Sequence, residues 1–306
     1  MSIVGVVMIL MLNSVPPSSA QLSISEQVTA LAKQFDGETG LYARNLISGE
    51  EISFNADARF PTASTIKTAV MLEAYHQSAE GKLRFDDVVA LTDAIKVGGS
   101  GVLNRLRAGL PLRISDLVEL MIVVSDNTAT NMLVERLGTK RIDDLLSALK
   151  LPDTKIFRPT FRDGRADVFP ELEREFGLGM TTPRQMAELM AMIAEGRAVN
   201  PDASAAMVAT LRRQTDKAMI PRLLPSGIEV GNKTGTDSEK LADANGHRGS
   251  IRADAEYRSP GCLQTPASFR PAQARLARAF QPRPTGAPSP RKQRPALPRT
   301  RGRSSA

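Results

Sequence analysis

Several residue types are scarce in this chain of 306 residues, and each scarcity excludes a class of protein. The single cysteine, Cys262, excludes an internal disulfide framework and a cysteine-rich metal site. The two histidines, His76 and His247, are too few for a histidine-based zinc site and supply a Ser-His-Asp triad poorly. Tryptophan is absent and aromatic residues make up 4% of the chain, so Leu, Met, Val and Ile must fill the core. We therefore expect neither a metal nor a cofactor, and any serine nucleophile needs a base other than histidine.

The formal net charge of +7 suggests a nucleic-acid partner until its location is considered. Eleven of the 40 Lys and Arg residues, and no Asp or Glu, lie between residues 257 and 306. The rest of the chain is mildly acidic, whereas a nucleic-acid-binding domain needs a basic surface. No nucleic-acid partner is expected.

The N-terminus carries an apolar run, Ile3 to Leu12, followed by small residues that end at Ala20. This pattern predicts a signal peptide over residues 1–20 and a periplasmic or secreted protein. The run is too short to span a bilayer, so no stable membrane anchor is expected. A basic segment before the run is missing, and a buried N-terminal helix is the alternative.

Hydrophobic periodicity predicts an α+β domain over residues 21–254. Two β-rich runs between Gly40 and Asn55 predict a hairpin. Helical spacing follows a capping box at Ser23 and Glu26 and recurs in other segments, namely from Thr62, over Ile114–Val124 and after Thr182. Ile228–Lys233 reads as a strand with His247–Ala253 as its partner. The predicted sheet thus joins both ends of the domain, with helices between them. We also expect the protein to be a monomer.

The segment 255–306 has a different composition. Nine of the chain's twenty prolines fall between residues 257 and 306, and no apolar periodicity is apparent after about Asp254. Such a segment cannot bury enough apolar surface to offset the entropy of ordering it. It is either a disordered basic tail or the product of a shifted reading frame.

The first chemical motif is Ser64 with Lys67 three residues later. At that spacing both side chains lie on one helical face. A serine hydroxyl is a weak nucleophile, and a lysine that has lost its charge can serve as its base. Alone the pattern is weak, because an ordinary surface helix contains it by chance.

Two further motifs favour the catalytic interpretation of Ser64 and Lys67 over a chance pattern. Ser125, Asp126 and Asn127 follow an apolar helix, where Ser125 could pass on a proton, Asn127 could bind a substrate amide and Asp126 would hold the loop. Lys233, Thr234 and Gly235 follow a predicted strand and offer a cation, a hydroxyl and room for a close ligand.

In order and spacing the three motifs resemble those of class A β-lactamases and penicillin-binding proteins. The resemblance covers roughly residues 25–253 and implies the β-lactamase-like fold, with a sheet of N- and C-terminal strands beside a helical lobe. It also implies that Ser64 attacks a β-lactam, with Lys67 and Ser125 moving protons. Asn127, Lys233, Thr234, Gly235 and Thr236 would bind the substrate, and the N–H groups of Ser64 and Thr236 would form the oxyanion hole. Arg222 stands where some family members place an arginine that assists, although it is equally an ordinary surface residue.

Two departures from the family pattern remain. Phe169 occupies the position of the glutamate that activates the deacylating water, and only Asp167, Glu171 and Glu173 supply carboxylates nearby. For each of these three, a solvated charge is the favoured interpretation. In the family, two strands and a closing helix follow the strand after the Lys-Thr-Gly motif. Beyond the predicted strand 247–253 nothing recognisable supplies them, so we expect the C-terminal strands and helix to be missing.

Three functions follow. The first is a β-lactamase that opens the lactam ring through an acyl-enzyme on Ser64. The second is a D,D-peptidase that acts on peptides ending in D-Ala-D-Ala. The third is a binder that penicillin acylates and that releases the product slowly or never.

Overall fold

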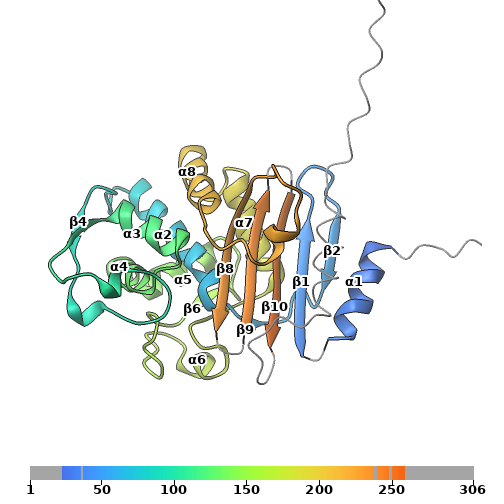
Figure 1. Cartoon of the computed structure of the whole chain (residues 1–306), viewed down its shortest axis with the longest axis horizontal. Helices are drawn as coiled ribbons and strands as arrows, with labels where there is room; N and C mark the ends of the chain where they lie inside the picture. Colours follow the sequence, from blue (N-terminus) through green and yellow to red (C-terminus); the bar gives the residue numbers. More distant parts are fainter. Residues whose placement is uncertain (1–22, 36, 238–239, 248–249, 259–306) are drawn as a thin grey trace, which may run out of the picture.

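A computed structural model describes residues 23–35, 37–237, 240–247 and 250–258 (Figure 1). The predicted signal peptide 1–20 lies outside these described residues, as does the predicted tail beyond residue 258. The described part has the α+β architecture expected from the sequence. Its main sheet is antiparallel with the order β2-β1-β10-β9-β8. These strands are β1 (Glu38–Arg44), β2 (Glu51–Phe54), β8 (Val230–Asp237), β9 (Lys240–His247) and β10 (Ser250–Arg258).

Two small sheets accompany the main one. The strands β3, β7 and β6 form one of them, and β4 pairs with β5 in the other. Their bounds are β3 (Phe60–Pro61), β4 (Val88–Ala90), β5 (Pro111–Arg113), β6 (Lys155–Ile156) and β7 (Gly179–Thr181).

The helices form a lobe beside the sheet, and α1 lies against β2 at the opposite edge of the sheet (Figure 1). The α-helices are α1 (Ile24–Lys33), α2 (Lys67–Ala79), α3 (Ile114–Val123), α4 (Asn127–Leu137), α5 (Thr139–Ala148), α6 (Pro170–Phe176), α7 (Pro183–Ala194) and α8 (Pro201–Arg212). The 3₁₀ turns are η1 (Ala63–Ile66), η2 (Asp93–Ile95), η3 (Leu103–Arg105) and η4 (Ile220–Leu223).

The predicted helix starts at Ser23 and Thr182 and the predicted hairpin are confirmed. Ser23 and Glu26 form the reciprocal capping box of α1, and the Thr182 side chain caps α7 with Pro183 in its first turn. The hairpin of β1 and β2 pairs Leu41 with Phe54. Local sequence chemistry decides these features because each cap or turn needs only neighbouring residues.

The expectation of missing C-terminal strands is wrong. Two strands, β9 and β10, follow β8, where the sequence predicted only one over 247–253. In β10, apolar Ile251, Ala253, Ala255 and Tyr257 alternate with charged residues, so the strand pattern continues past the predicted boundary at Asp254. The strand β9 is rich in Ala, Asp, Asn and Gly, which have low strand propensity, and its pairing with β8 and β10 defines it. The expected loss of the closing helix concerns residues outside the described part.

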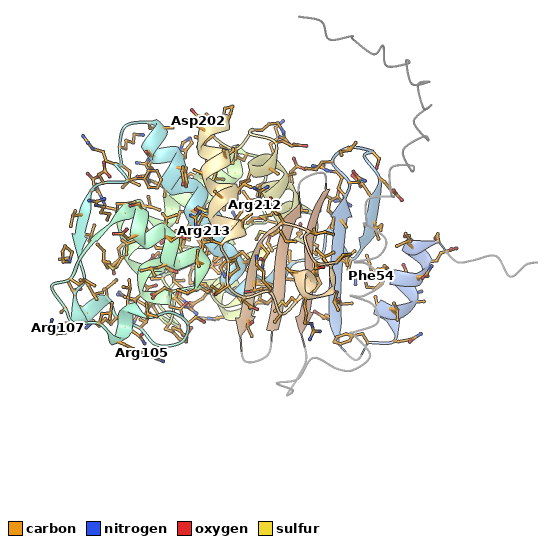
Figure 2. The ribbon with its side chains drawn as sticks, turned by 45° about the horizontal axis from the view of Figure 1, so that its top comes forward. Phe54, Arg105, Arg107, Asp202, Arg212 and Arg213 are labelled. Atoms are coloured by element: carbon orange, nitrogen blue, oxygen red, sulfur yellow. The ribbon has the colours of Figure 1, made fainter. Side chains whose placement is uncertain are left out.

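The main hydrophobic core lies among the helices, and α2 passes through its middle. Eight consecutive residues, Lys67 to Ala74, are buried, so α2 has almost no exposed face. The helix α7 contacts β1, β9 and β10 and thereby joins this core to the sheet. Arg213 lies just after α8, where Figure 2 labels it. Its guanidinium donates two hydrogen bonds of 2.6 Å to Glu119 of α3. The elements that carry the three motifs are therefore held in one packed unit.

Candidate active site

Ser64 lies in η1, and Lys67 is the first residue of α2. The sequence predicted one helix from Thr62, but the chain first makes a 3₁₀ turn, in which residues three apart lie directly above one another. Ala63, just before Ser64, has a φ of 43°, a left-handed conformation that is strained for alanine. Hydrogen bonds hold the turn: Thr65 Oγ1 donates to the Thr62 carbonyl at 2.7 Å, and Thr62 N–H donates to Gly179 of β7 at 2.9 Å.

Lys67 is completely buried, and its amine donates to three oxygens. These are the carbonyl oxygen of Ser125 at 2.7 Å, the hydroxyl of Ser125 at 3.1 Å and Oδ1 of Asn127 at 2.7 Å. Burial, followed by the nearby positive charge of Lys233, lowers the pKa of Lys67 well below its usual value. A lysine that gives up its proton easily is suited to act as a base toward a serine.

Ser125 joins both site lysines. Its hydroxyl accepts hydrogen bonds from Lys67 Nζ at 3.1 Å and from Lys233 Nζ at 3.0 Å, so one oxygen bridges the helical lobe and the sheet. The φ of Ser125 is 56°, again in the left-handed region, which turns the chain sharply between α3 and α4. Strain of this kind persists only where surrounding contacts enforce it.

Asp126 and Asn127 hold the loop around Ser125. The Asp126 side chain caps α4 and also accepts the N–H groups of Val102 at 2.6 Å and Leu103 at 2.9 Å, as predicted for a loop-holding residue. Asn127 is the first residue of α4. Its side chain binds Lys67 through Oδ1 and donates to the Gly98 carbonyl at 3.0 Å. Much of the Asn127 amide is therefore occupied in holding the site together.

The site has two walls: one is formed by η1, α2 and the loop at Ser125, and the other by the strand β8. Lys233 is completely buried and donates to Ser125, and also to the Thr234 carbonyl at 2.6 Å. The Thr234 hydroxyl donates to Asp216 Oδ2 at 2.9 Å. Thr236 is exposed at the end of this wall. The predicted residues of the helical lobe and of the strand thus meet at one place.

Gly235 explains how closely the two walls approach. A Cβ atom at this position would lie 2.8 Å from the Thr62 carbonyl oxygen and 2.9 Å from the Ser64 nitrogen. Only glycine allows this contact between β8 and η1, whereas the sequence predicted that Gly235 gives room to a ligand. The backbone N–H of Ser64 therefore lies beside β8, where an oxyanion hole needs it.

The segment that follows β6, which includes α6, keeps one of the candidate carboxylates buried. Glu173 is 7% exposed, and its Oε1 accepts hydrogen bonds from Arg158 Nε at 2.6 Å and Gly164 N–H at 2.7 Å. Arg158 is equally buried and also pairs with Asp163. The interpretation of Glu173 as a solvated charge is wrong, because the buried Arg158 requires a partner.

Asp167 and Glu171 are exposed, in agreement with the favoured interpretation. Asp167 accepts a hydrogen bond from the Thr139 hydroxyl at 2.6 Å, and Glu171 lies in the first turn of α6. Phe169 precedes α6 with a φ of 51° and packs edge-on against Phe157. Among the hydrogen bonds of the described residues, none links a carboxylate to Ser64 or to the amine of Lys67.

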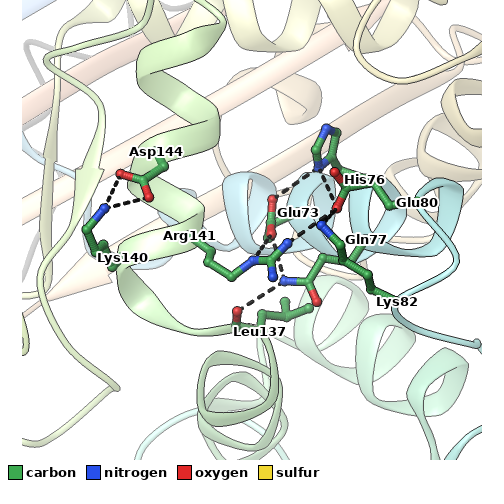
Figure 3. Close-up of polar contacts among 9 residues, drawn as sticks. All are labelled: Glu73, His76, Gln77, Glu80, Lys82, Leu137, Lys140, Arg141 and Asp144. Carbon is green, nitrogen blue, oxygen red and sulfur yellow. Dashed lines mark hydrogen bonds and ion pairs between the residues drawn. The ribbon is translucent and has the colours of Figure 1, made fainter.

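A further buried carboxylate, Glu73, lies on α2 (Figure 3). It accepts a hydrogen bond from Gln77 Nε2 at 2.7 Å and lies 3.5 Å from Arg141 and 3.7 Å from His76. Burial raises its pKa. These partners come from α2 and α5 and separate Glu73 from the motif residues, so it belongs to the core of the helical lobe.

Sequence reasoning missed two residues that the structure connects to the site: Asp216, which binds Thr234, and Arg158, which binds Glu173. Neither belongs to a motif, and only a contact across the fold shows them. Arg222 is exposed in η4, and its predicted role stays a prediction. No helix in the described part has the length and apolar character of a membrane span, and the same part contains no cluster of three potential metal ligands.

Residues 23–256 match the sequence pattern of the β-lactamase enzyme family. The chain belongs to this family. The β-lactamase of Amycolatopsis lactamdurans is 30% identical over 224 residues, which cover 72% of this chain and 70% of that protein. The β-lactamase CARB-3 of Pseudomonas aeruginosa is 22% identical over 222 residues, 71% of this chain and 74% of its own length.

Solved structures give the same assignment for this β-lactamase family member. The crystal structure of a β-lactamase from Sphaerobacter thermophilus has a TM-score of 0.72 and 29% identity, covering 84% of this chain and 94% of that one. PBP-A has a TM-score of 0.73 and 25% identity, covering 84% and 95%. The likeness therefore extends to both β-lactamases and PBP-A, and the chain is a hydrolase of the β-lactamase type.

Proposed function

We propose that this hydrolase opens β-lactam rings by forming an acyl-enzyme on Ser64. The observation that carries the proposal is the continuous set of contacts from Lys67 through Ser125 to Lys233. Lys67 takes the proton of the Ser64 hydroxyl as its oxygen attacks the lactam carbonyl. Ser125 then gives its own proton to the lactam nitrogen as the carbon–nitrogen bond breaks, and Lys67 passes the proton taken from Ser64 on to Ser125. Lysine and serine thus take the part that histidine has in other serine hydrolases.

The substrate is held on β8 in this proposal. The N–H groups of Ser64 and Thr236 stabilise the developing oxyanion, which contributes about 3–4 kcal/mol per donor in hydrolases of this kind. The positive charge of Lys233 attracts the carboxylate of the substrate. Gly235 lets β8 pack against η1, which brings the Ser64 N–H beside the strand that carries Lys233 and Thr234.

A second candidate, a penicillin-binding protein that deacylates slowly, is favoured by the loop carboxylates. Glu173 binds Arg158 and Asp167 binds Thr139, and among the described residues neither carboxylate has a hydrogen bond to Ser64 or to the amine of Lys67. Another structure similar to this chain, a point mutant of PBP-A, is an acyl-enzyme complex with penicillin G, with a TM-score of 0.73 and 25% identity. The same acylation chemistry would serve a D,D-peptidase.

A chase with fluorescent penicillin separates these candidates. The purified chain is labelled, excess unlabelled penicillin is added, and the bound label is followed on a denaturing gel. Prompt loss of label identifies a β-lactamase, whereas persistent label identifies the slow deacylation of a penicillin-binding protein. Release of D-alanine from a peptide ending in D-Ala-D-Ala would identify the peptidase.

The same experiment is run on Ser64→Ala, which removes the nucleophile and should not be labelled. The matched control is Ser48→Ala, which alters a serine in the turn between β1 and β2. Ser48→Ala should label like the unchanged chain. Labelling of folded Ser64→Ala at the same rate would contradict the proposal, as would the absence of label on the unchanged chain.

We further propose that the protein is exported and cleaved after Ala20, on the basis of the apolar run from Ile3 and the small residues before Gln21. N-terminal sequencing of the protein from periplasm or medium tests this. A mature chain that begins at Gln21 is the expected result, and retention of Met1 on all of the protein would contradict it.

A further inference from the structure

The short segment from Gln214 to Lys217 connects the two walls of the site. On the helical side, Gln214 Nε2 donates to the Ile122 carbonyl at 2.6 Å, and Thr215 N–H donates to Val123 at 3.1 Å. These two residues of α3 come just before Ser125. The segment is therefore fixed to the end of the helix that carries the proton-relay serine.

On the other side the same segment is fixed to β8. Asn232 Nδ2 donates to the Asp216 carbonyl at 2.9 Å, and Lys217 Nζ donates to Asn232 Oδ1 at 2.6 Å. Asn232 is fully buried and precedes Lys233. The position of the Asp216 side chain is thus set from both walls.

The Asp216 carboxylate uses both of its oxygens. Oδ1 accepts the N–H of Ala218 at 3.0 Å, and Oδ2 accepts the Thr234 hydroxyl at 2.9 Å. A hydroxyl has one hydrogen, and an ionised carboxylate can only accept hydrogen bonds. While Thr234 donates to Asp216, it cannot also donate to the carboxylate of a substrate.

We infer that Asp216 is a specificity-determining residue that weakens the binding of substrate carboxylates by occupying the hydroxyl hydrogen of Thr234. The inference rests on the proposed function, in which Lys233 binds the substrate carboxylate, and it takes the neighbouring substrate-binding residue Thr234 as a second donor to that carboxylate. Asp216 acts through Thr234 and also places a negative charge near the subsite. Substrates with an anionic group there bind less well than Lys233 and Thr234 alone would allow.

Asp216→Asn tests the inference with little change in shape. The asparagine oxygen can still accept Ala218 N–H, while its NH₂ group can donate to Thr234 Oγ1 and leave the hydroxyl hydrogen to the substrate. Binding is measured by calorimetry in the Ser64→Ala background, so the result does not depend on acylation. The probes are benzylpenicillin, which carries the carboxylate, and its methyl ester, which does not.

Asp216→Asn should tighten the binding of benzylpenicillin about tenfold, the effect of one hydrogen bond to a charged group, and leave the ester unchanged. The gain should disappear when Thr234→Val is also present. Thr215→Ala, which alters the same segment without contacting Thr234, should not change the ratio of the two affinities.

A purely structural role for Asp216 gives a different result, because it would weaken both ligands or neither. Unchanged or weaker binding of benzylpenicillin to folded Asp216→Asn overturns the inference, and so does an equal gain for the ester or failure of both ligands to bind. The proposed function is tested separately by labelling of the chain with Ser64 intact, so the two failures are distinguishable.

Discussion

Two regions of this molecule bury charged side chains and use them in opposite ways. At the meeting point of α2, the Ser125 loop and β8, two buried lysines share one serine hydroxyl. In the loop from Arg158 to Phe176, a buried arginine and a buried glutamate bind each other. The first region gathers charge with reactive groups, whereas the second neutralises charge to fix its own conformation. Under the proposed function, the first region supplies the groups for acylation, and the carboxylates of the second region make no hydrogen bond to it.

The largest effect should come from removing the base of the first region. Lys67→Met should slow labelling by fluorescent penicillin by about 10²–10⁴-fold, the range for a lost general base. Because the pKa of Lys67 is lowered, its amine loses its proton at a lower pH than the amine of an exposed lysine. Labelling of the unchanged chain should therefore rise with pH through the pKa of Lys67, and Lys67→Met should lose this dependence.

The control for that experiment is Lys82→Met, which alters an exposed lysine outside the site. It should label like the unchanged chain. If Lys67→Met labelled at the full rate, the base would lie elsewhere and the first region would lose its assigned chemistry.

The next effect tests the second region. Arg158→Ala leaves Glu173 buried without its cation, which should lower the free energy of unfolding by about 3–5 kcal/mol. Urea denaturation measures this change. Arg162→Ala, the matched control, removes the partner of the exposed Glu135 and should change stability by less than about 1 kcal/mol. Equal effects of the two substitutions would show that the pair of Arg158 and Glu173 does not fix the loop.

A smaller effect is expected on the pH dependence of stability, through Asp143, which binds the strand β6 just before this loop. Asp143 of α5 accepts the N–H of Ile156 at 2.9 Å, and burial raises its pKa to about 7. Between pH 4 and 7 the folded state keeps a proton that the unfolded state has released, so this contribution to stability is complete below pH 4 and lost as pH rises through about 7. The free energy of unfolding should fall over this range by between about 2 and 4 kcal/mol.

Asp143→Asn should flatten that pH dependence, because asparagine keeps the acceptor and does not titrate. Asp144→Asn alters an exposed neighbour and should leave the slope as it is. Urea unfolding at several pH values measures both. A slope that persists in Asp143→Asn would assign the titration to another group.

The smallest effect is expected at the exposed carboxylates of the loop. Asp167→Asn and Glu171→Gln should change the release of bound penicillin by less than about twofold, since neither residue activates the deacylating water and a true general base contributes about 10²–10⁴-fold. The chase experiment on purified variants gives the rates. A large slowing in either variant would identify the missing base and make the two regions parts of one catalytic cycle.

The C-terminal strands show where sequence reasoning was limited. The alternation in β10 was present in the sequence, but its charged residues resembled the basic tail that follows. The strand β9 has little strand propensity, and its partners on both sides define it. Pairing between segments far apart in the chain overrides local preference in such cases.

The sequence by itself determined the motif residues, the hairpin and the helix caps. Spacing, turn chemistry and capping express these features over a few neighbouring residues. Only the tertiary structure decided that Lys67 bonds to Ser125 and Asn127, that Arg158 holds Glu173 inside the loop and that Asp216 occupies the Thr234 hydroxyl. Each of these depends on which polar atoms burial brings together, because a buried donor or acceptor must find its partner wherever the fold places one.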